Sequence, residues 1–178
     1  MIEFDGFEIS PIKEKDAWIL CDFAITNEDR LKQFFPGTLA QNLTPELSKY
    51  FVSKKNKQFD SKEEFLFTLK EKESRFLAGL VYIKELDWSK KKGEFAYCIG
   101  YEFEGKGLTS KAIKILSNHA FNSLGIETLQ IIVHKSNISS VRVAEKCNFV
   151  WQKTLLKEFT PPNELPLDME LYELHNER

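Results

Sequence analysis

The sequence contains only three cysteines, Cys21, Cys98 and Cys147, and no two of them form a C-x-x-C pair. An odd number of widely spaced cysteines argues against a disulfide framework or a zinc site and favours a reducing compartment. We therefore expect no metal ion in the protein, and we expect it in the cytoplasm.

Long apolar runs and a dominant charge are also missing. No apolar stretch approaches the roughly 20 residues of a membrane-spanning helix. The opening residues MIEFDGFEIS carry acids where a signal peptide carries basic residues. The 25 basic residues are balanced by 27 acidic ones, whereas proteins that bind duplex nucleic acid are strongly basic on one face. We expect neither membrane insertion nor direct binding of nucleic acid.

The apolar residues that are present suffice for one folded domain. Of the 178 residues, 42% are hydrophobic and 13% are aromatic, which excludes an intrinsically disordered chain. No repeat, low-complexity tract or linker divides the sequence, and domains average roughly 100–200 residues. The sequence therefore predicts a single domain over residues 1–178, acting as a monomer or a homodimer.

Hydrophobic periodicity predicts an α+β (mixed α/β) fold. Helices are indicated by 3.6-residue apolar spacing and by start signals such as Thr44-Pro45-Glu46. Ser61-Lys62-Glu63-Glu64 has the spacing of a capping box, yet the alternating residues after it favour a strand. The expected helices are Lys13–Asn27, Glu28–Phe35, Thr44–Lys57, Gly107–Gly125 and Ser139–Cys147, and the expected strands are Phe7–Ile12, Phe65–Lys70, Phe76–Leu86, Glu94–Tyr101, Thr128–His134, Phe149–Glu158 and Asp168–His175.

Gly105-Lys106-Gly107 stands between a predicted strand and a predicted helix. Glycines let the backbone approach a ligand closely, and the unpaired N–H groups at a helix start carry the positive end of the helix dipole. Lys106 adds a cation, and Thr109 and Ser110 add hydroxyl donors. This junction is suited to a pyrophosphate, although Gly-x-Gly before a helix also arises by chance.

A second motif follows about 30 residues later, where Asn137-Ile138-Ser139-Ser140 opens a helix and Lys146-Cys147-Asn148-Phe149 closes it. With Ile9–Asp16, Gly79 and Glu94-x-x-Tyr97, this order resembles the GNAT superfamily of N-acetyltransferases, most of all its RimJ/RimL branch, whose members acetylate protein N-termini. The resemblance spans about Phe7 to Leu174. It implies a GNAT-like fold with a central, mixed, mostly antiparallel twisted sheet of six to seven strands, flanking helices and a splayed pair of parallel strands.

The resemblance also implies roles for particular residues. Acetyl-coenzyme A would be the co-substrate, Glu94 the general base and Ser140 the proton donor to the leaving thiolate. The acceptor, a protein or peptide N-terminus or a small amine, would lie near Phe34, Phe35 and Tyr97. The residues implied to bind the cofactor are Ile99, Tyr101, Lys106, Gly107, Leu108, Thr109, Ser110 and Asn137.

Three positions depart from the superfamily pattern. Glu104 replaces the usual Gln or Arg of the phosphate loop, so its carboxylate must point away from a bound pyrophosphate. Thr109 replaces a small residue, and Asn148 replaces a glycine, although asparagine tolerates a left-handed backbone.

Simpler interpretations exist for the same residues. Glu94 is also explained as an exposed strand residue, Ser140 as a helix cap, Tyr97 as a core residue and Asn137 as a turn residue. Three functions stay open: acetylation of a protein α-amine, acetylation of a small amine, and acyl-coenzyme A binding without catalysis.

Overall fold

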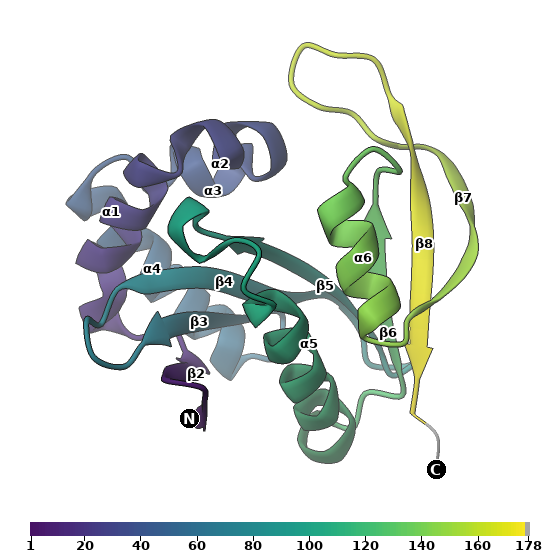
Figure 1. The fold of residues 1–178 in the computed structure, drawn as a ribbon, viewed down its shortest axis with the longest axis horizontal. Helices are drawn as coiled ribbons and strands as arrows, with labels where there is room; N and C mark the ends of the chain where they lie inside the picture. Colours follow the sequence, from purple (N-terminus) through teal and green to yellow (C-terminus); the bar gives the residue numbers. More distant parts are fainter. Residues whose placement is uncertain (177–178) are drawn as a thin grey trace. The chain divides into compact units, whose positions relative to one another are not determined.

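The computed structural model describes residues 1–176, and it has the expected mixed α/β class (Figure 1). Neighbouring strands are hydrogen-bonded in the order β1-β2-β3-β4-β5-β6-β8-β7. The helices are α1 (Ala17–Thr26), α2 (Glu28–Phe34), α3 (Pro36–Ala40), α4 (Pro45–Asp60), α5 (Leu108–His119) and α6 (Ile138–Lys146). The strands are β1 (Ile2–Phe4), β2 (Phe7–Pro11), β3 (Phe65–Glu71), β4 (Leu77–Asp87), β5 (Lys92–Ile99), β6 (Thr128–Val133), β7 (Val150–Phe159) and β8 (Leu167–His175).

Two compact units share the chain. The first unit holds residues 1–82 and 97–108, and the second holds residues 83–96 and 109 onward. Strands β4 and β5 each contribute residues to both units. That the whole chain is one domain stays a prediction, and the last two residues of its predicted range lie outside the described residues.

The first unit buries one face of an antiparallel sheet beneath helices. Its strand β2 pairs antiparallel with both β1 and β3, and α4 contacts both α1 and β3. Phe51 of α4 and Phe65 of β3 are almost fully buried. Gly79 of β4 is needed for space, because a Cβ atom there would lie 2.6 Å from the carbonyl oxygen of Cys98.

A charged cluster is also buried in the first unit. The Lys70 ammonium, 1% exposed, lies 3.1 Å from Asp16 Oδ1 and 3.5 Å from Glu8 Oε1. Arg75 donates to Glu8 Oε2 at 2.8 Å, and this bond is the largest cause that lowers the pKa of Glu8. Two cations thus face two carboxylates, which is how buried charges are tolerated.

The second unit contains a parallel pair of strands and one exposed edge. Residues Lys92–Phe95 of β5 pair in parallel with Thr128–Ile131 of β6, and this ladder ends there. Strand β6 pairs antiparallel with β8, which pairs with the edge strand β7. Helix α6 contacts β6 and lies over it in Figure 1. The predicted parallel pair is therefore confirmed.

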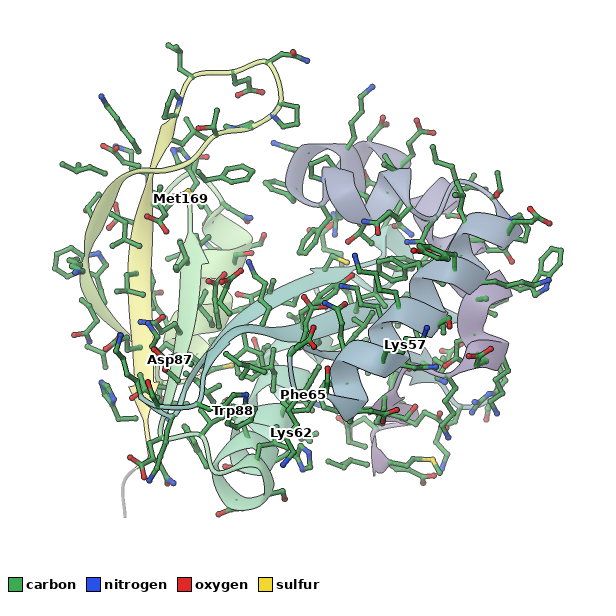
Figure 2. All side chains as sticks on the ribbon, turned by 180° about the vertical axis from the view of Figure 1, so that it is seen from behind. Lys57, Lys62, Phe65, Asp87, Trp88 and Met169 are labelled. Atoms are coloured by element: carbon green, nitrogen blue, oxygen red, sulfur yellow. The ribbon has the colours of Figure 1, made fainter. Side chains whose placement is uncertain are left out.

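The turn between β4 and β5 also belongs to the second unit, and Asp87 and Trp88 are labelled there in Figure 2. Asp87 Oδ1 accepts hydrogen bonds from the Ser89 hydroxyl at 2.6 Å and from the Lys90 amide at 3.1 Å. These bonds, the Ser89 bond foremost, lower the pKa of Asp87 to about 2. The side chain therefore closes the hairpin as an ionised acceptor.

The structure differs from the sequence prediction mainly at element ends. Eight strands replace the six or seven expected, because the exposed segment Ile2–Phe4 folds back on β2 through a turn with positive φ at Asp5 and Gly6. The helix expected over Lys13–Asn27 begins at Ala17, after a 3-10 turn. The helix expected over Glu28–Phe35 ends at Phe34, and Pro36 then occupies the first turn of α3, where its missing N–H costs nothing.

The ambiguous segment after α4 is resolved as predicted, in favour of the strand. Ser61 is the C-cap of α4 rather than the start of a helix, and Lys62 turns the chain with a φ of 58°. Phe65–Glu71 then runs as strand β3. Thr44 caps the start of α4 as its sequence indicated, because its side chain accepts from the Leu47 amide.

Candidate functional site

The loop before α5 is the segment for which the sequence predicted an anion site. Gly105 and Gly107 both have a φ of 74°, in the left-handed region that favours glycine. A Cβ atom at either position would meet nothing within 4 Å, so backbone conformation and not space calls for glycine here. Residues 104–107 of the loop are exposed.

Helix α5 begins at Leu108, directly after this loop. Leu108 is buried and anchors the first turn, whereas Thr109 and Ser110 are half-buried. The first amides of a helix have no partner within it, so they present donors and partial positive charge at this end. Exposed Lys106 places its ammonium 5.2 Å from the centre of the Phe103 ring.

Glu104 is paired with Arg30 of α2. The Arg30 guanidinium donates to Glu104 Oε2 at 2.6 Å, and its other terminal nitrogen donates to the Ile99 carbonyl oxygen at 2.8 Å. The same guanidinium lies 4.4 Å from the centre of the Tyr101 ring. The negative charge that Glu104 brings in place of the family's Gln or Arg is thus neutralised by Arg30, a cation within the first unit.

The end of β5 differs from the prediction. The strand ends at Ile99, and Tyr101 begins a 3-10 turn, because α2 and the residue before it bind the chain there. Asn27, buried before α2, accepts from the Tyr101 amide at 2.9 Å. The Gly100 amide donates to Ala78 on β4. Since amide directions alternate along a strand, the Ile99 amide points away from β4.

Glu94 lies on β5 in the second unit, with a side chain 14% exposed. Lys84 on β4 places its ammonium 3.0 Å from the Glu94 carboxylate. Burial raises the pKa of Glu94 above its ordinary value, and Lys84 opposes that rise only in part. A carboxyl group with a raised pKa beside a lysine has the character of a tuned proton acceptor.

Glu94 also belongs to a polar row on the sheet of the second unit. Its register partner on β6 is Gln130, whose side-chain amide donates to Glu173 of β8 at 2.6 Å. The row gives this part of the sheet hydrogen-bonding side chains from three neighbouring strands, β5, β6 and β8.

The start of α6 brings Asn137 and Ser140 together. Asn137 is the N-cap, and its Oδ1 accepts from the Ser140 amide at 3.3 Å and from the Ser139 hydroxyl at 3.0 Å. The interpretation of Ser140 as the cap is therefore wrong, because Ser140 is the third residue of the helix and its amide is the group being capped. Ser140 is half-buried.

The aromatic residues predicted near the acceptor lie in the first unit. Phe34 is 44% exposed at the end of α2, whereas Phe35 stacks on Tyr82 of β4 with ring centres 6.2 Å apart. Tyr82 is buried, and its hydroxyl shares a hydrogen bond with Thr38. Tyr97 is half-buried on β5. Phe35 thus packs against the sheet, whereas Phe34 is exposed and can contact a substrate.

Sequence reasoning missed three residues that the structure brings to these groups: Arg30, Asn27 and Lys84. Arg30 and Asn27 lie some 70 positions before the segment they bind, so no local pattern indicates them. Lys84 was detectable in principle, because a hairpin with a turn near Ser89 places it opposite Glu94.

Two absences hold for residues 1–176. No group of three or more His, Cys, Asp or Glu side chains there could hold a metal ion, and none of the helices there combines the length and hydropathy that a bilayer crossing needs. The three cysteines are buried and unpaired, and burial raises the pKa of the Cys98 thiol to about 12.

Comparison with known proteins gives a family and several relatives. Residues 7–150 match the family model described as "Acetyltransferase (GNAT) domain". Spermidine N(1)-acetyltransferase of Escherichia coli K12 is 33% identical over 82 residues, a match that covers 46% of this chain and 44% of that protein. The matched region thus spans less than half the length of this curated relative.

Solved structures share the fold over nearly the whole chain. A ribosomal-protein-S5-alanine acetyltransferase from Vibrio fischeri superposes with a TM-score of 0.90 at 20% identity, covering 99% of this chain and 96% of that one. RimL, a ribosomal-protein α-N acetyltransferase solved with coenzyme A, superposes with a TM-score of 0.88 at 16% identity, covering 96% and 94%. At these identities the likeness establishes the fold.

Proposed function

Because the chain belongs to the acetyltransferase (GNAT) domain family, we propose that it transfers the acetyl group of acetyl-coenzyme A to a primary amine. Enzymes of this family use acetyl-coenzyme A, and the resemblance to the family that the sequence indicated is confirmed. The observation that carries the proposal is the pair of left-handed glycines, Gly105 and Gly107, directly before the first residue of α5.

The diphosphate of the coenzyme would bind at this loop. Backbone amides of Lys106–Ser110 would donate to it, assisted by the positive end of α5 and the Lys106 ammonium. The open space around both glycines supports this assignment, because a bulky anion needs an unobstructed backbone. Leu108 contributes its amide while its buried side chain fixes the turn.

The pantetheine arm would run along the end of β5. The Ile99 amide points away from β4, which supports the assignment of Ile99 to this arm, and Tyr101 is assigned to it through the family resemblance. The Tyr101 N–H already donates to Asn27, whereas the Ile99 oxygen accepts from Arg30 and keeps one lone pair. The backbone of Ile99 is therefore the part of this segment that would serve the ligand. Asn137 would donate from its Nδ2, since its Oδ1 is engaged as the cap of α6.

Bound acetyl-coenzyme A supplies an acetyl group already activated as a thioester. The chain's own work is to move two protons. Glu94, directly or through water, would accept the proton that the attacking amine loses as its nitrogen bonds to the carbonyl carbon. Ser140 would donate a proton to the sulfur as the carbon–sulfur bond breaks. The raised pKa of Glu94 supports its role, because a base works best when its pKa is near the working pH.

The finer proposal is that the acceptor is a protein N-terminal α-amine, beside Phe34, Phe35 and Tyr97. An α-amine titrates near 7.7–8.0 and a lysine near 10.4, so neutralising the lysine costs about 3.5 kcal/mol more. A single carboxylate is better suited to the α-amine. The names of the Vibrio fischeri enzyme and of RimL agree with such an acceptor, and they support a cytoplasmic location.

A small polyamine is the second candidate, and it is favoured by the relative from Escherichia coli, which is named for spermidine. The two acceptors are separable by assay. Thiol release from acetyl-coenzyme A is measured with peptides that begin with Ser or Ala and, separately, with spermidine. Turnover on the peptides supports the finer proposal, and turnover on spermidine alone replaces it with the second candidate. Coenzyme A binding with no turnover on any amine would refute the catalytic function.

A further inference from the structure

Arg30 binds three points of the segment that leads into the glycine loop. It contacts the Ile99 carbonyl oxygen at 2.8 Å, the Tyr101 ring at 4.4 Å and Glu104 Oε2 at 2.6 Å. All of these residues belong to the first unit. Planar guanidinium groups suit such combined hydrogen-bonding and stacking contacts.

The two members of the ion pair differ in exposure. The Arg30 side chain is 17% exposed, whereas that of Glu104 is 49% exposed. Arg30 is therefore the more restrained side chain of the pair. Without Arg30, the Glu104 carboxylate would be able to turn into solvent or toward the loop. Its neighbour in sequence, Gly105, is the first residue of that loop.

A carboxylate next to a diphosphate site is unfavourable unless its charge is compensated. Like charges repel over the few ångströms involved, and a bound diphosphate carries more than one negative charge. The Arg30 guanidinium cancels the charge of Glu104 and holds its oxygen at one place. A glutamine or arginine at this position would need no such partner.

We propose that Arg30 is a positioning residue for the coenzyme: it neutralises Glu104 and restrains it beside the glycine loop, so that the diphosphate meets no uncompensated negative charge. This inference rests on the proposed function, since it requires that the loop binds the diphosphate. Arg30 itself acts through Glu104 and need not touch the ligand.

A purely structural role for Arg30, as support for the end of β5, predicts different behaviour. Loss of support would weaken every part of the coenzyme alike. Loss of charge compensation would weaken the binding of only those ligands that carry the diphosphate. Removing the Glu104 charge as well would restore that binding. Pantetheine, which lacks the diphosphate, therefore separates the two roles.

The test measures dissociation constants of coenzyme A and of pantetheine by calorimetry. The proteins are the wild type, Arg30→Ala, Glu104→Gln and the Arg30→Ala/Glu104→Gln double variant. Lys72→Ala is the matched control, because Lys72 forms an exposed ion pair of the same 2.6 Å length with Glu3. For Arg30→Ala we expect about tenfold weaker coenzyme A binding, equal to about 1.4 kcal/mol, with unchanged pantetheine binding.

The double variant should recover most of the lost affinity, and Glu104→Gln alone should bind coenzyme A at least as tightly as the wild type. Equal weakening of both ligands by Arg30→Ala, or no recovery in the double variant, would overturn the inference while leaving the proposed function intact. Failure of the wild type to bind coenzyme A would overturn the proposed function and this inference with it.

Discussion

The ammonium of Lys84 and the carboxylate of Glu94 lie 3.0 Å apart in the hairpin formed by β4 and β5. Burial raises the pKa of Glu94 and Lys84 lowers it, with the nearby charges of Glu85 and Glu158 adding to the rise. The net direction is upward. Lys84 therefore limits how far the proton affinity of the proposed base increases.

Replacing Lys84 should move the pH dependence of the reaction. Lys84→Met removes the positive charge that lowers the pKa of Glu94, so that pKa rises further. On acidification, Glu94 is then protonated, and its function as a base is lost, at a higher pH than in the wild type. We expect the acid limb of kcat/KM to shift upward by about one pH unit. Lys90→Met, on the exposed turn of the same hairpin, is the control and should leave the limb in place. An unmoved limb in Lys84→Met would exclude Glu94 as the titrating base.

Removing the base itself should give a loss that depends on pH. Glu94→Gln keeps the shape of the side chain but cannot take a proton, so about a 10²-fold fall in kcat is expected near pH 7. The loss should shrink as pH rises, because more of the amine is then neutral without help. Steady-state rates from pH 6 to 9.5 measure this. A loss that is constant with pH would assign Glu94 a structural role.

The sequence could predict the parts of the site that depend on short-range geometry. Asn148 adopts the left-handed conformation that the sequence allowed for it, with a φ of 64°, and Gly105 and Gly107 adopt it as well. Strand and helix order follows from periodicity of 2 or 3.6 residues, and this decided Phe65–Glu71 correctly against a capping-box signal.

The missed features depend on tertiary contacts. Arg30 and Glu104 are 74 positions apart, and no local pattern reports which cation will meet a given carboxylate. The early end of β5 has the same origin, because Asn27 takes the Tyr101 amide that a longer strand would use. The cap of α6 was assigned to Ser140, three residues after the observed cap Asn137, since asparagine and serine both serve as caps.

The buried charged cluster of the first unit predicts a large stability effect. Lys70→Met would leave buried Asp16 without the cation that pairs with it and would leave Glu8 with Arg75 alone. Breaking a buried ion pair by removing one partner typically costs about 3–5 kcal/mol, and we expect a loss of that size in urea unfolding at pH 7. Lys72→Met, at an exposed pair on the same part of the chain, should cost less than about 1 kcal/mol. Equal losses would mean that the cluster is not specially stabilising.

The glycine loop predicts a binding defect whose size depends on the residue that replaces Gly107. Gly107→Ala forces a Cβ residue into a φ of 74°, at a cost of about 1–2 kcal/mol, without any steric contact within 4 Å. The loop should relax away from this conformation, and coenzyme A binding should weaken about tenfold. Gly107→Asn should bind better than Gly107→Ala, because asparagine visits the left-handed region more readily. Equal binding by both variants would show that the conformation of Gly107 does not matter to the ligand.

Asn137 combines two roles that different substitutions separate. Its Oδ1 caps α6 by accepting from the Ser140 amide, whereas its Nδ2 is the group proposed to donate to the coenzyme. Asn137→Asp keeps the acceptor and adds a charge favoured at a helix N-terminus, so the melting temperature should hold. It loses the donor and places a negative charge by the ligand, so KM for acetyl-coenzyme A should rise about tenfold.

Asn137→Ala loses both groups, and it should raise KM while lowering stability by about 1 kcal/mol. Ser140→Ala is the complementary variant. Its amide still donates to Asn137, so the cap of α6 is kept, while kcat should fall more than affinity for the coenzyme because the proposed proton donor to the thiolate is gone. Stability is read from thermal unfolding and the kinetic constants from thiol release. A normal KM in Asn137→Asp would show that Asn137 only caps α6 and does not bind the coenzyme. A normal kcat in Ser140→Ala would show that Ser140 is not the proton donor.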